Sequence, residues 1–576
     1  MKAFRKVMCI VLAVMLAALA VVIPVSAAKA VPLVVVKGLA GFPLVKDLGT
    51  ADEKQLFPFA EEDIQPMVTN ILTALVKAYV AYGVTNDNWD VYCDELLPVI
   101  NKYIDPIAYN PNGTPKYDNV TEKSYDTSMA AFPVDGKTDE EKQAQNAERE
   151  EIFTVFGVEY AKQYGDKNVY SFGYDWRRSP IDCAKELDEF IAKVKKETGS
   201  SKVNVVAISE GAAVTLAYMD GYNCKNLNNV VFASPAWQGT SLMGWLFTGD
   251  IELDIFTMEN YLVQLGNGSF VTHFASVLIS SIASYEGLSH EYFAKFNYIL
   301  QKMLPRIYSD TIYPLLCGMP GLWCLVPGEY YEAAKAYMYP NGMDADFEAK
   351  IDAYYNIQSN AKAIVEAAEK KGVRFGIVCG YNCQIAPVNK YYPTSDSVVD
   401  TKYASGGATC AEYLKAFSDW GTEYTQAIKD DHDHVSWDQK VDASTCMFRE
   451  QVWFIKNLQH VAYNAAYGTT DIVMWLLSAD KQYTVHTDEE KYPQFSLYNT
   501  YTKTTKPCPT TGIIGDVDLS TAVTVSDARL ALLFALEIET PTDEQIILGD
   551  IDEDGKISTS DARAILCMAL GIEVPD

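Results

Sequence analysis

The sequence predicts an α/β fold built around a mostly parallel sheet. Short β-branched runs over 31–36, 203–208 and 229–233 are typical of strands that are buried on both faces. The sheet is also expected to include a stretch over 168–177, and an amphipathic stretch over 184–198 leads from it into the run that ends before Ser209. Strands that alternate with helices form parallel sheets through right-handed crossovers. The second run stops at Ser209, and small residues follow at once. We therefore expect the sheet to be organised around the turn at Ser209.

Residues 1–30 have the layout of a secretory signal peptide. Basic residues precede an apolar run over 7–25, and small residues offer cleavage sites after Ala28 or Ala30. An uncleaved membrane anchor is the alternative, because the run is nearly long enough to span a bilayer. No later stretch of the sequence could be a second span, so a soluble, exported protein is expected.

The composition, with 49% hydrophobic residues over 576 positions, is enough for one large core and a further small unit. Cleavage after Ala30 would take the formal charge from −29 to about −33. Such an acidic surface argues against binding to nucleic acid or to anionic membranes. The twelve cysteines lack metal-type spacing, but Cys317 with Cys324, and Cys379 with Cys383, are close enough in sequence to form disulfides.

Residues 207–211 read Ala-Ile-Ser-Glu-Gly, a G-x-S-x-G pattern with alanine in the first position. A strand that ends on a serine and turns sharply into a helix presents the hydroxyl to a base and to backbone N–H groups, so Ser209 is the candidate nucleophile. The glycine-bounded turn after 31–36 can direct further N–H groups into the site. The candidate oxyanion hole is formed by the N–H groups of Glu210 and Leu39, with Ala40 as the near alternative to Leu39.

The candidate acid is Asp396, which follows a late strand over 373–380, and Asp400 is the alternative. In the order nucleophile, acid, base, the base is a histidine beyond the acid. His434, in a polar loop, is the favoured base. His460 is the alternative, since the spacing of apolar residues at 452, 455 and 458 predicts a helix there instead of a catalytic loop.

Three segments together resemble the lecithin:cholesterol acyltransferase-like branch of the α/β-hydrolases. They are 32–41, the Gly-Tyr-Asp-Trp-Arg stretch over 173–177, and the Ser209 turn with the 234–240 segment that follows it. The similarity covers roughly 31–250 and resumes over about 372–478. It implies that a lipid or other ester acylates Ser209 and that the acyl group then passes to water or to an alcohol. Ala207 and Glu210 depart from the family's pattern.

The expected hydrolase domain spans 31–478. Within it, residues 61–165 look like an insertion whose sequence indicates no chemistry. A helical, aromatic stretch over about 250–370 is expected to form a lid over the site, which would receive an ester with an apolar acyl chain. Residues 479–512 are polar and rich in threonine, with prolines near their end, which predicts an extended linker.

The last segment, 513–576, contains a repeat in which Gly-Asp-x-Asp and Ser-Asp-Ala-Arg recur after 34 residues. Its oxygen-bearing groups fall at positions 1, 3, 5, 7, 9 and 12 of calcium-binding loops. The first loop offers Asp516, Asp518, Ser520, the carbonyl of Ala522, Thr524 and Asp527. The second offers Asp550, Asp552, Asp554, the carbonyl of Lys556, Ser558 and Asp561. The first loop should bind more weakly, because Thr521 replaces the turn glycine and Ser520 replaces an acid.

Two loop-helix units that end in aspartate resemble a dockerin, a small all-α calcium-binding module. The resemblance implies Ca²⁺ as its cofactor and attachment to a cohesin of a cellulosome-like scaffold, so the protein is expected outside the cell or at its surface. The sequence as a whole predicts a secreted serine esterase or lipase that needs no cofactor for catalysis. Acyl transfer to an alcohol, or a hydrolase-fold module that only binds, are the alternatives.

Overall fold

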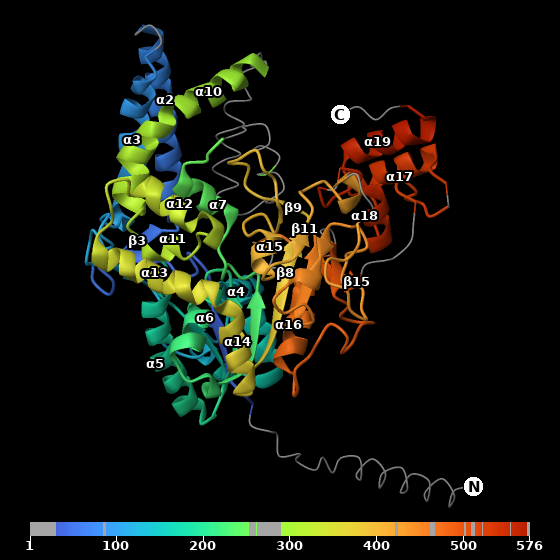
Figure 1. Ribbon diagram of the computed structural model, residues 1–576, viewed down its shortest axis with the longest axis horizontal. Coiled ribbons are helices and arrows are strands. Elements are labelled where there is room, and N and C mark those ends of the chain that lie inside the picture. Colours follow the sequence, from blue (N-terminus) through green and yellow to red (C-terminus); the bar gives the residue numbers. More distant parts are fainter. Residues whose placement is uncertain are drawn as a thin grey trace, which may run out of the picture.

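An eight-stranded sheet forms the centre of the computed structural model, with the order β15-β14-β13-β8-β7-β6-β1-β5 (Figure 1). Neighbouring strands are parallel except for β14 and β15, which are antiparallel. The predicted α/β-hydrolase fold with a mostly parallel sheet is thus confirmed. The structure describes residues 30–84, 88–252, 261, 290–420, 424–460, 467–499, 503–507, 513–520, 522–552 and 554–572.

The strands of this sheet are β1 (Leu33–Val36), β5 (Val169–Phe172), β6 (Val203–Ile208), β7 (Leu227–Ala233), β8 (Arg374–Tyr381), β13 (Val452–Lys456), β14 (Phe495–Asn499) and β15 (Thr504–Pro507). Three smaller sheets contain β2 (Leu44–Lys46), β3 (Lys54–Phe57) and β4 (Val120–Glu122); β9 (Cys383–Gln384) and β10 (Thr394–Ser395); and β11 (Thr409–Cys410) and β12 (Val441–Asp442). The helices are α2 (Glu61–Val84), α3 (Asp90–Ile104), α4 (Asp139–Tyr164), α5 (Pro180–Thr198), α6 (Gly211–Gly221), α7 (Ser241–Thr248), α10 (His290–Ile307), α11 (Pro320–Trp323), α12 (Gly328–Met338), α13 (Ala345–Ser359), α14 (Ala361–Lys370), α15 (Thr401–Ala404), α16 (Tyr467–Leu477), α17 (Val525–Ala535), α18 (Asp543–Gly549) and α19 (Thr559–Leu570).

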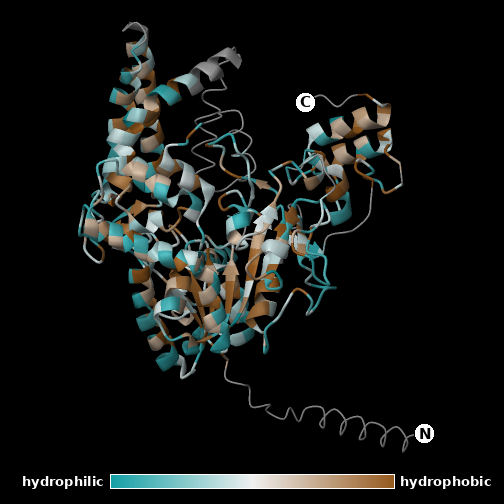
Figure 2. Cartoon of the chain, viewed as in Figure 1, coloured by the Kyte–Doolittle hydropathy of each residue, from teal (hydrophilic) through white to brown (hydrophobic). Residues whose placement is uncertain are grey.

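Helices cover both faces of the sheet, as its buried strands require. Side chains alternate along a strand, so Val34 and Val36 join a core with α5, α6, α13 and α14. Leu33 and Val35 point the other way, into a core with α4 and α16. Figure 2 shows the apolar strands between these two helical layers. The carboxyl ends of the parallel strands therefore share one edge, which is where this class of fold carries its sites.

The region expected to be a lid divides into two parts in the structure. Helix α10 packs with α2 and α3 of the 61–165 insertion, and the three project together from the sheet (Figure 1). Helices α13 and α14 instead contact α6 in the layer that covers the sheet. Residues 253–260 and 262–289 of the expected lid lie outside the described residues. Insertion and lid region thus contribute to one helical arm, whereas α13 and α14 are core helices.

The segment 479–512 differs from the extended linker that its sequence predicts, because it supplies β14 and β15 of the main sheet. Leu497 and Tyr498 are buried, and the Trp453 indole donates to the carbonyl of Tyr492 at 3.1 Å. Strand β15 lies at the edge, where a proline such as Pro507 is tolerated. The composition of this edge, with its threonines and a proline, therefore predicts a linker, and the strand forms only because it pairs with β14.

The C-terminal segment folds into α17, α18 and α19 around a small core that includes Val517, Phe534 and Ile565. It also touches the edge of the main sheet: Asn499 donates to Asp543 at 2.8 Å, and Lys506 lies 3.2 Å from the same carboxylate. The module is therefore not joined by a linker alone, as the sequence led us to expect.

The signal peptide predicted for residues 1–30 lies almost wholly outside the described residues. In the part of the chain that is described, no helix combines the length and the apolar character needed to cross a bilayer. The ten cysteines described are all free, including Cys317, Cys324, Cys379 and Cys383, so neither of the two suggested disulfides is formed.

Candidate active site

Ser209 occupies a strained turn between β6 and α6, with a φ of 54° that side-chain-bearing residues rarely adopt. A Cβ at Gly211 would lie 2.3 Å from the carbonyl oxygen of Val36, so only glycine lets α6 pass this close to β1. A Cβ at Gly38 would lie 2.5 Å from the Ser209 Cβ. The predicted nucleophile elbow is thus present as geometry, packed against the turn that follows β1.

The turn after β1 is closed by a hydrogen bond from the N–H of Gly41 to the carbonyl of Gly38 at 2.9 Å. Leu39 and Ala40 are its two central residues, and Ala40 has a φ of 58°. Because Gly38 contacts Ser209, this turn and the N-terminus of α6 at Glu210 border the same space. The arrangement suits an oxyanion hole, which needs backbone donors beside the nucleophile.

The buried Asp396 and the partly buried His460 form a pair beyond the carboxyl ends of β8 and β13. The Nδ1 atom of His460 lies 2.8 Å from Oδ2 of Asp396, and the backbone N–H of His460 donates to the Asp396 carbonyl at 2.6 Å. The other carboxylate oxygen accepts the N–H groups of Val398 at 3.1 Å and Val399 at 2.8 Å. A Cβ at Gly380 would lie 2.2 Å from the Leu458 carbonyl oxygen, so glycine allows the 457–460 segment to approach Asp396.

His434, the base favoured from the sequence, lies elsewhere and must be replaced by His460 as the partner of Asp396. The His434 side chain is fully buried, with Nδ1 2.7 Å from Gln494 Oε1 and Nε2 3.3 Å from Asp430. The physical reason is the secondary structure before His460: residues 452–456 form the buried strand β13, and the predicted helix is absent there. His460 thus follows a strand at the same edge of the sheet as Ser209.

Asp400, the alternative acid, has a structural partner. Its carboxylate accepts the backbone N–H of Ser241 at 2.8 Å and the Ser241 hydroxyl at 2.6 Å, at the start of α7. Burial raises the pKa of Asp400 to about 6 despite these bonds. It therefore anchors α7 and contacts neither His434 nor His460 by any hydrogen bond described.

Ser234 is the residue at this site to which the sequence analysis assigned no role. It follows β7, next to Ala233, whose carbonyl accepts the N–H of Ser209 at 3.2 Å. Its hydroxyl donates to Oδ2 of Asp396 and lies 2.9 Å from Nδ1 of His460. The sequence feature that could have indicated Ser234 is its place at the end of β7, the strand that pairs with β6.

Glu210 is buried, with 1% of its surface exposed. Its Oε2 atom has no hydrogen-bond partner among the described residues. Burial, and then the charge of Asp175, raise the pKa of Glu210 well above its usual range. The buried environment therefore favours the neutral form of the Glu210 carboxyl, next to Ser209 in the sequence.

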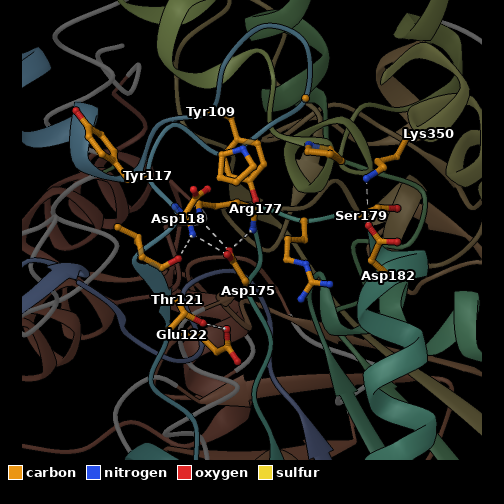
Figure 3. Close-up of a pocket in the computed structure, with 15 residues that line it drawn as sticks. Tyr109, Tyr117, Asp118, Thr121, Glu122, Asp175, Arg177, Ser179, Asp182 and Lys350 are labelled. Carbon is orange, nitrogen blue, oxygen red and sulfur yellow. Dashed lines mark hydrogen bonds and ion pairs between the residues drawn. The ribbon is translucent and has the colours of Figure 1, made fainter. Parts of the chain in front are cut away.

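A pocket of about 340 Å³ follows the carboxyl end of β5, around Asp175 and Arg177 (Figure 3). Arg177 forms a bidentate ion pair with Asp175, at 2.9 and 2.6 Å, and donates to the carbonyls of Ile107 and Val120. The guanidinium thus ties the 105–122 segment to the sheet. This assigns a structural role to the 173–177 stretch that carried part of the family resemblance.

The C-terminal module gathers its acids into two clusters, Asp516 with Asp518 and Asp527, and Asp550 with Asp552 and Asp561. Within each cluster, ligand oxygens lie within 4.8 Å of one another. In the second, Oδ1 of Asp550 is buried with no hydrogen-bond partner in the described part of the chain. Burial raises the pKa of Asp550 well above its usual range, and that of Asp554 to about 6, with neighbouring carboxylates adding to both shifts. These donors fit a hard divalent cation such as Ca²⁺.

Backbone geometry completes the second loop. Gly555 has a φ of 88°, as the tight turn of a calcium loop requires, and its N–H donates to Asp550 at 2.9 Å. Asp527 and Asp561 each hold the N-terminus of the helix that follows through a capping box with Thr524 and Ser558. The two loops share this pattern, although residue 521 of the first lies outside the described chain.

Comparison with protein families gives one match, to the family described as Lipase (class 2), over residues 140–234. A comparison with curated proteins found no match. Seven chains of solved structures match. One, titled "The crystal structure of Tle4-Tli4 complex", is 11% identical with a TM-score of 0.28, and the match covers 62% of this chain and 76% of that one. The matched family segment contains Ser209 and ends at Ser234, and it supports a lipase- or esterase-type hydrolase.

Proposed function

We propose that this protein is a secreted serine hydrolase that cleaves carboxylic esters through an acyl-enzyme. The observation that carries the proposal is the hydrogen-bonded pair of Asp396 and His460 at the sheet edge where Ser209 occupies its strained turn. An ordered acid-base pair beside a serine on an elbow is the constellation of acyl-transfer enzymes. Ser209, His460 and Asp396 take the roles of nucleophile, base and acid.

In the proposed reaction, Oγ of Ser209 attacks the ester carbonyl while Nε2 of His460 takes the hydroxyl proton. The oxyanion accepts hydrogen bonds from the N–H of Glu210 and from that of Leu39, with Ala40 as the alternative donor. Collapse of the tetrahedral intermediate expels the alcohol, which receives the proton from His460. Water then attacks the acyl-Ser209 carbonyl by the same route and releases the acid.

The C-terminal module would hold two Ca²⁺ ions and attach the enzyme to a cohesin of a scaffold outside the cell. The first ion would be bound by Asp516, Asp518, Ser520, the Ala522 carbonyl, Thr524 and Asp527, and the second by Asp550, Asp552, Asp554, the Lys556 carbonyl, Ser558 and Asp561. The bound ions would neutralise the clustered carboxylates. The supporting observation is the buried Asp550 oxygen, which lacks a hydrogen-bond partner among the described residues.

A fluorophosphonate probe tests the nucleophile, since it reacts only with an activated serine. Wild-type protein should be labelled at Ser209, and Ser209→Ala should be neither labelled nor active. His460→Ala should lower ester turnover by about 10⁴-fold, whereas His434→Ala is the matched control and should retain a folded, active site. An active His460→Ala, or loss of labelling only in His434→Ala, would refute the assignment. A screen of esters by acyl-chain length, with an added alcohol acceptor, separates lipase from acyltransferase.

A further inference from the structure

Ser234 has a buried hydroxyl directed at both the acid and the base of the proposed triad. The residue is fully buried, with a φ of 47°, and its N–H donates to the Val378 carbonyl at 2.8 Å. This bond joins the end of β7 to β8, the strand of the main sheet that comes before Asp396 in the chain. The hydroxyl is therefore held in place by the sheet itself.

Three atoms meet at this point: Oγ of Ser234, Oδ2 of Asp396 and Nδ1 of His460. A serine hydroxyl has one proton to donate, and an ionised carboxylate can only accept. The proton of Ser234 goes to Asp396 Oδ2, the closer acceptor. Nδ1 of His460 then faces two oxygens that accept, so Nδ1 carries the proton of the neutral ring. Nε2 is left with its lone pair, which is the form a general base requires.

We propose that Ser234 is a positioning residue that, through Asp396, holds His460 in the tautomer whose Nε2 accepts a proton. This inference rests on the proposed function. The Ser234 proton goes to Asp396, and the Ser234 oxygen is then an acceptor beside Nδ1 of His460, so a proton on Nδ1 is favoured over one on Nε2.

The neighbouring titratable groups do not interfere with this effect. Tyr261, Cys379 and Cys383 sense the charge of Asp396, and burial raises the pKa of all three, so they stay neutral while a histidine titrates. The charged groups on the adjoining elements have partners of their own. Lys456 on β13 is paired with Asp438 at 3.2 Å, and Asp400 binds Ser241.

Ser234→Ala removes the hydroxyl, and Ser171→Ala is a matched control. Ser171 is a buried serine of β5 whose hydroxyl has no hydrogen-bond partner among the described residues. We expect Ser234→Ala to lower kcat about tenfold with little change in KM, and Ser171→Ala to stay within about twofold. Ser234→Gly, which suits the positive φ, serves if the alanine variant does not fold. A loss no larger than that of Ser171→Ala would overturn the proposal.

A second readout separates positioning from general structural damage. In ¹⁵N-histidine-labelled protein, loss of the Ser234 hydroxyl should let part of the neutral His460 ring carry its proton on Nε2, and the ¹⁵N chemical shifts of Nδ1 and Nε2 report this fraction. In an Asp396→Asn background, Ser234→Ala should add little to the loss of kcat. An unchanged tautomer of His460, or a full tenfold loss in that background, would overturn the proposal. The NMR measurement needs no turnover, so failure of Ser209 labelling would refute the proposed function separately.

Discussion

Asp396 and Asp550 are both buried carboxylates, but the chain surrounds them in opposite ways. The oxygens of Asp396 accept hydrogen bonds from two backbone N–H groups, from Ser234 and from His460. Asp550 has one oxygen without a hydrogen-bond partner in the described chain, and its carboxylate neighbours Asp554 and Asp561 raise its pKa further. Hydrogen-bond donors of the protein surround Asp396, whereas the surroundings of Asp550 disfavour its charge, as expected of a carboxylate that binds a cation.

This difference separates two uses of the same side chain. A buried carboxylate surrounded by donors can stay ionised and orient a neighbouring imidazole. A buried carboxylate surrounded by its own kind is protonated or bound to metal, because desolvation and repulsion both oppose its charge. The environment, and not the residue type, thus distinguishes the candidate catalytic acid from the candidate calcium ligand.

The same substitution at the two sites should give the largest difference in effect on activity. Asp396→Asn should lower kcat about 10⁴-fold, because asparagine cannot favour the required tautomer of His460 or stabilise its cation. Asp550→Asn should keep kcat/KM within about threefold and weaken calcium binding instead. Ester kinetics and calorimetric calcium titration of both full-length variants give the measurement. Equal losses of activity in the two variants would show that the sites are not independent.

Calcium removal tests the second half of the comparison. Without a cation, repulsion within the two acid clusters should open the small module, whose core has little area to offset it. We expect chelator to make the 513–576 segment of the full chain sensitive to protease and calcium to restore resistance. Lys556→Ala is the matched control, since only its backbone carbonyl is a proposed ligand. Equal protease resistance with and without chelator would contradict the calcium assignment.

Sequence patterns predicted those features that depend on neighbouring residues in the chain. The buried strands, the Ser209 turn and the acid spacing of the loops follow from neighbouring residues. The choice between His434 and His460 could not be made in this way. Over so few residues, the apolar pattern of β13 is equally compatible with a helix. Ser234 and the strands of 479–512 depend on pairings between distant segments, which one sequence does not encode locally.

The raised pKa values in the second loop predict the pH dependence of the calcium-free module. The pKa of Asp554 is about 6 in the folded state, above the usual 3.8. The pKa of Asp550 is also raised well above its usual value. A group whose folded pKa is raised contributes stability below its unfolded pKa, and this contribution is lost as pH rises through the folded value. Asp554 alone would account for roughly 3 kcal/mol at most.

In chelator, the module should therefore resist protease best near pH 4 and lose resistance as pH rises past 6. In calcium, protons compete with the cation for the same oxygens, so resistance should increase with pH instead. Protease protection of the full chain between pH 4 and 8 in both conditions gives the measurement. Parallel pH profiles with and without calcium would contradict the predicted linkage.

The smallest effect is expected at Glu210, a third buried carboxyl that has neither a set of donors nor a cation site. Burial favours its neutral form, and its proposed role in the oxyanion hole uses the backbone N–H and not the side chain. Glu210→Gln keeps size and neutrality, so kcat/KM should stay within about threefold. Because the folded pKa of Glu210 is raised, wild-type stability should fall as pH rises, and the glutamine variant should lose less. Thermal unfolding of both proteins from pH 6 to 9 measures this difference. A loss of activity beyond about 100-fold in the glutamine variant would mean that Glu210 acts through its carboxyl group.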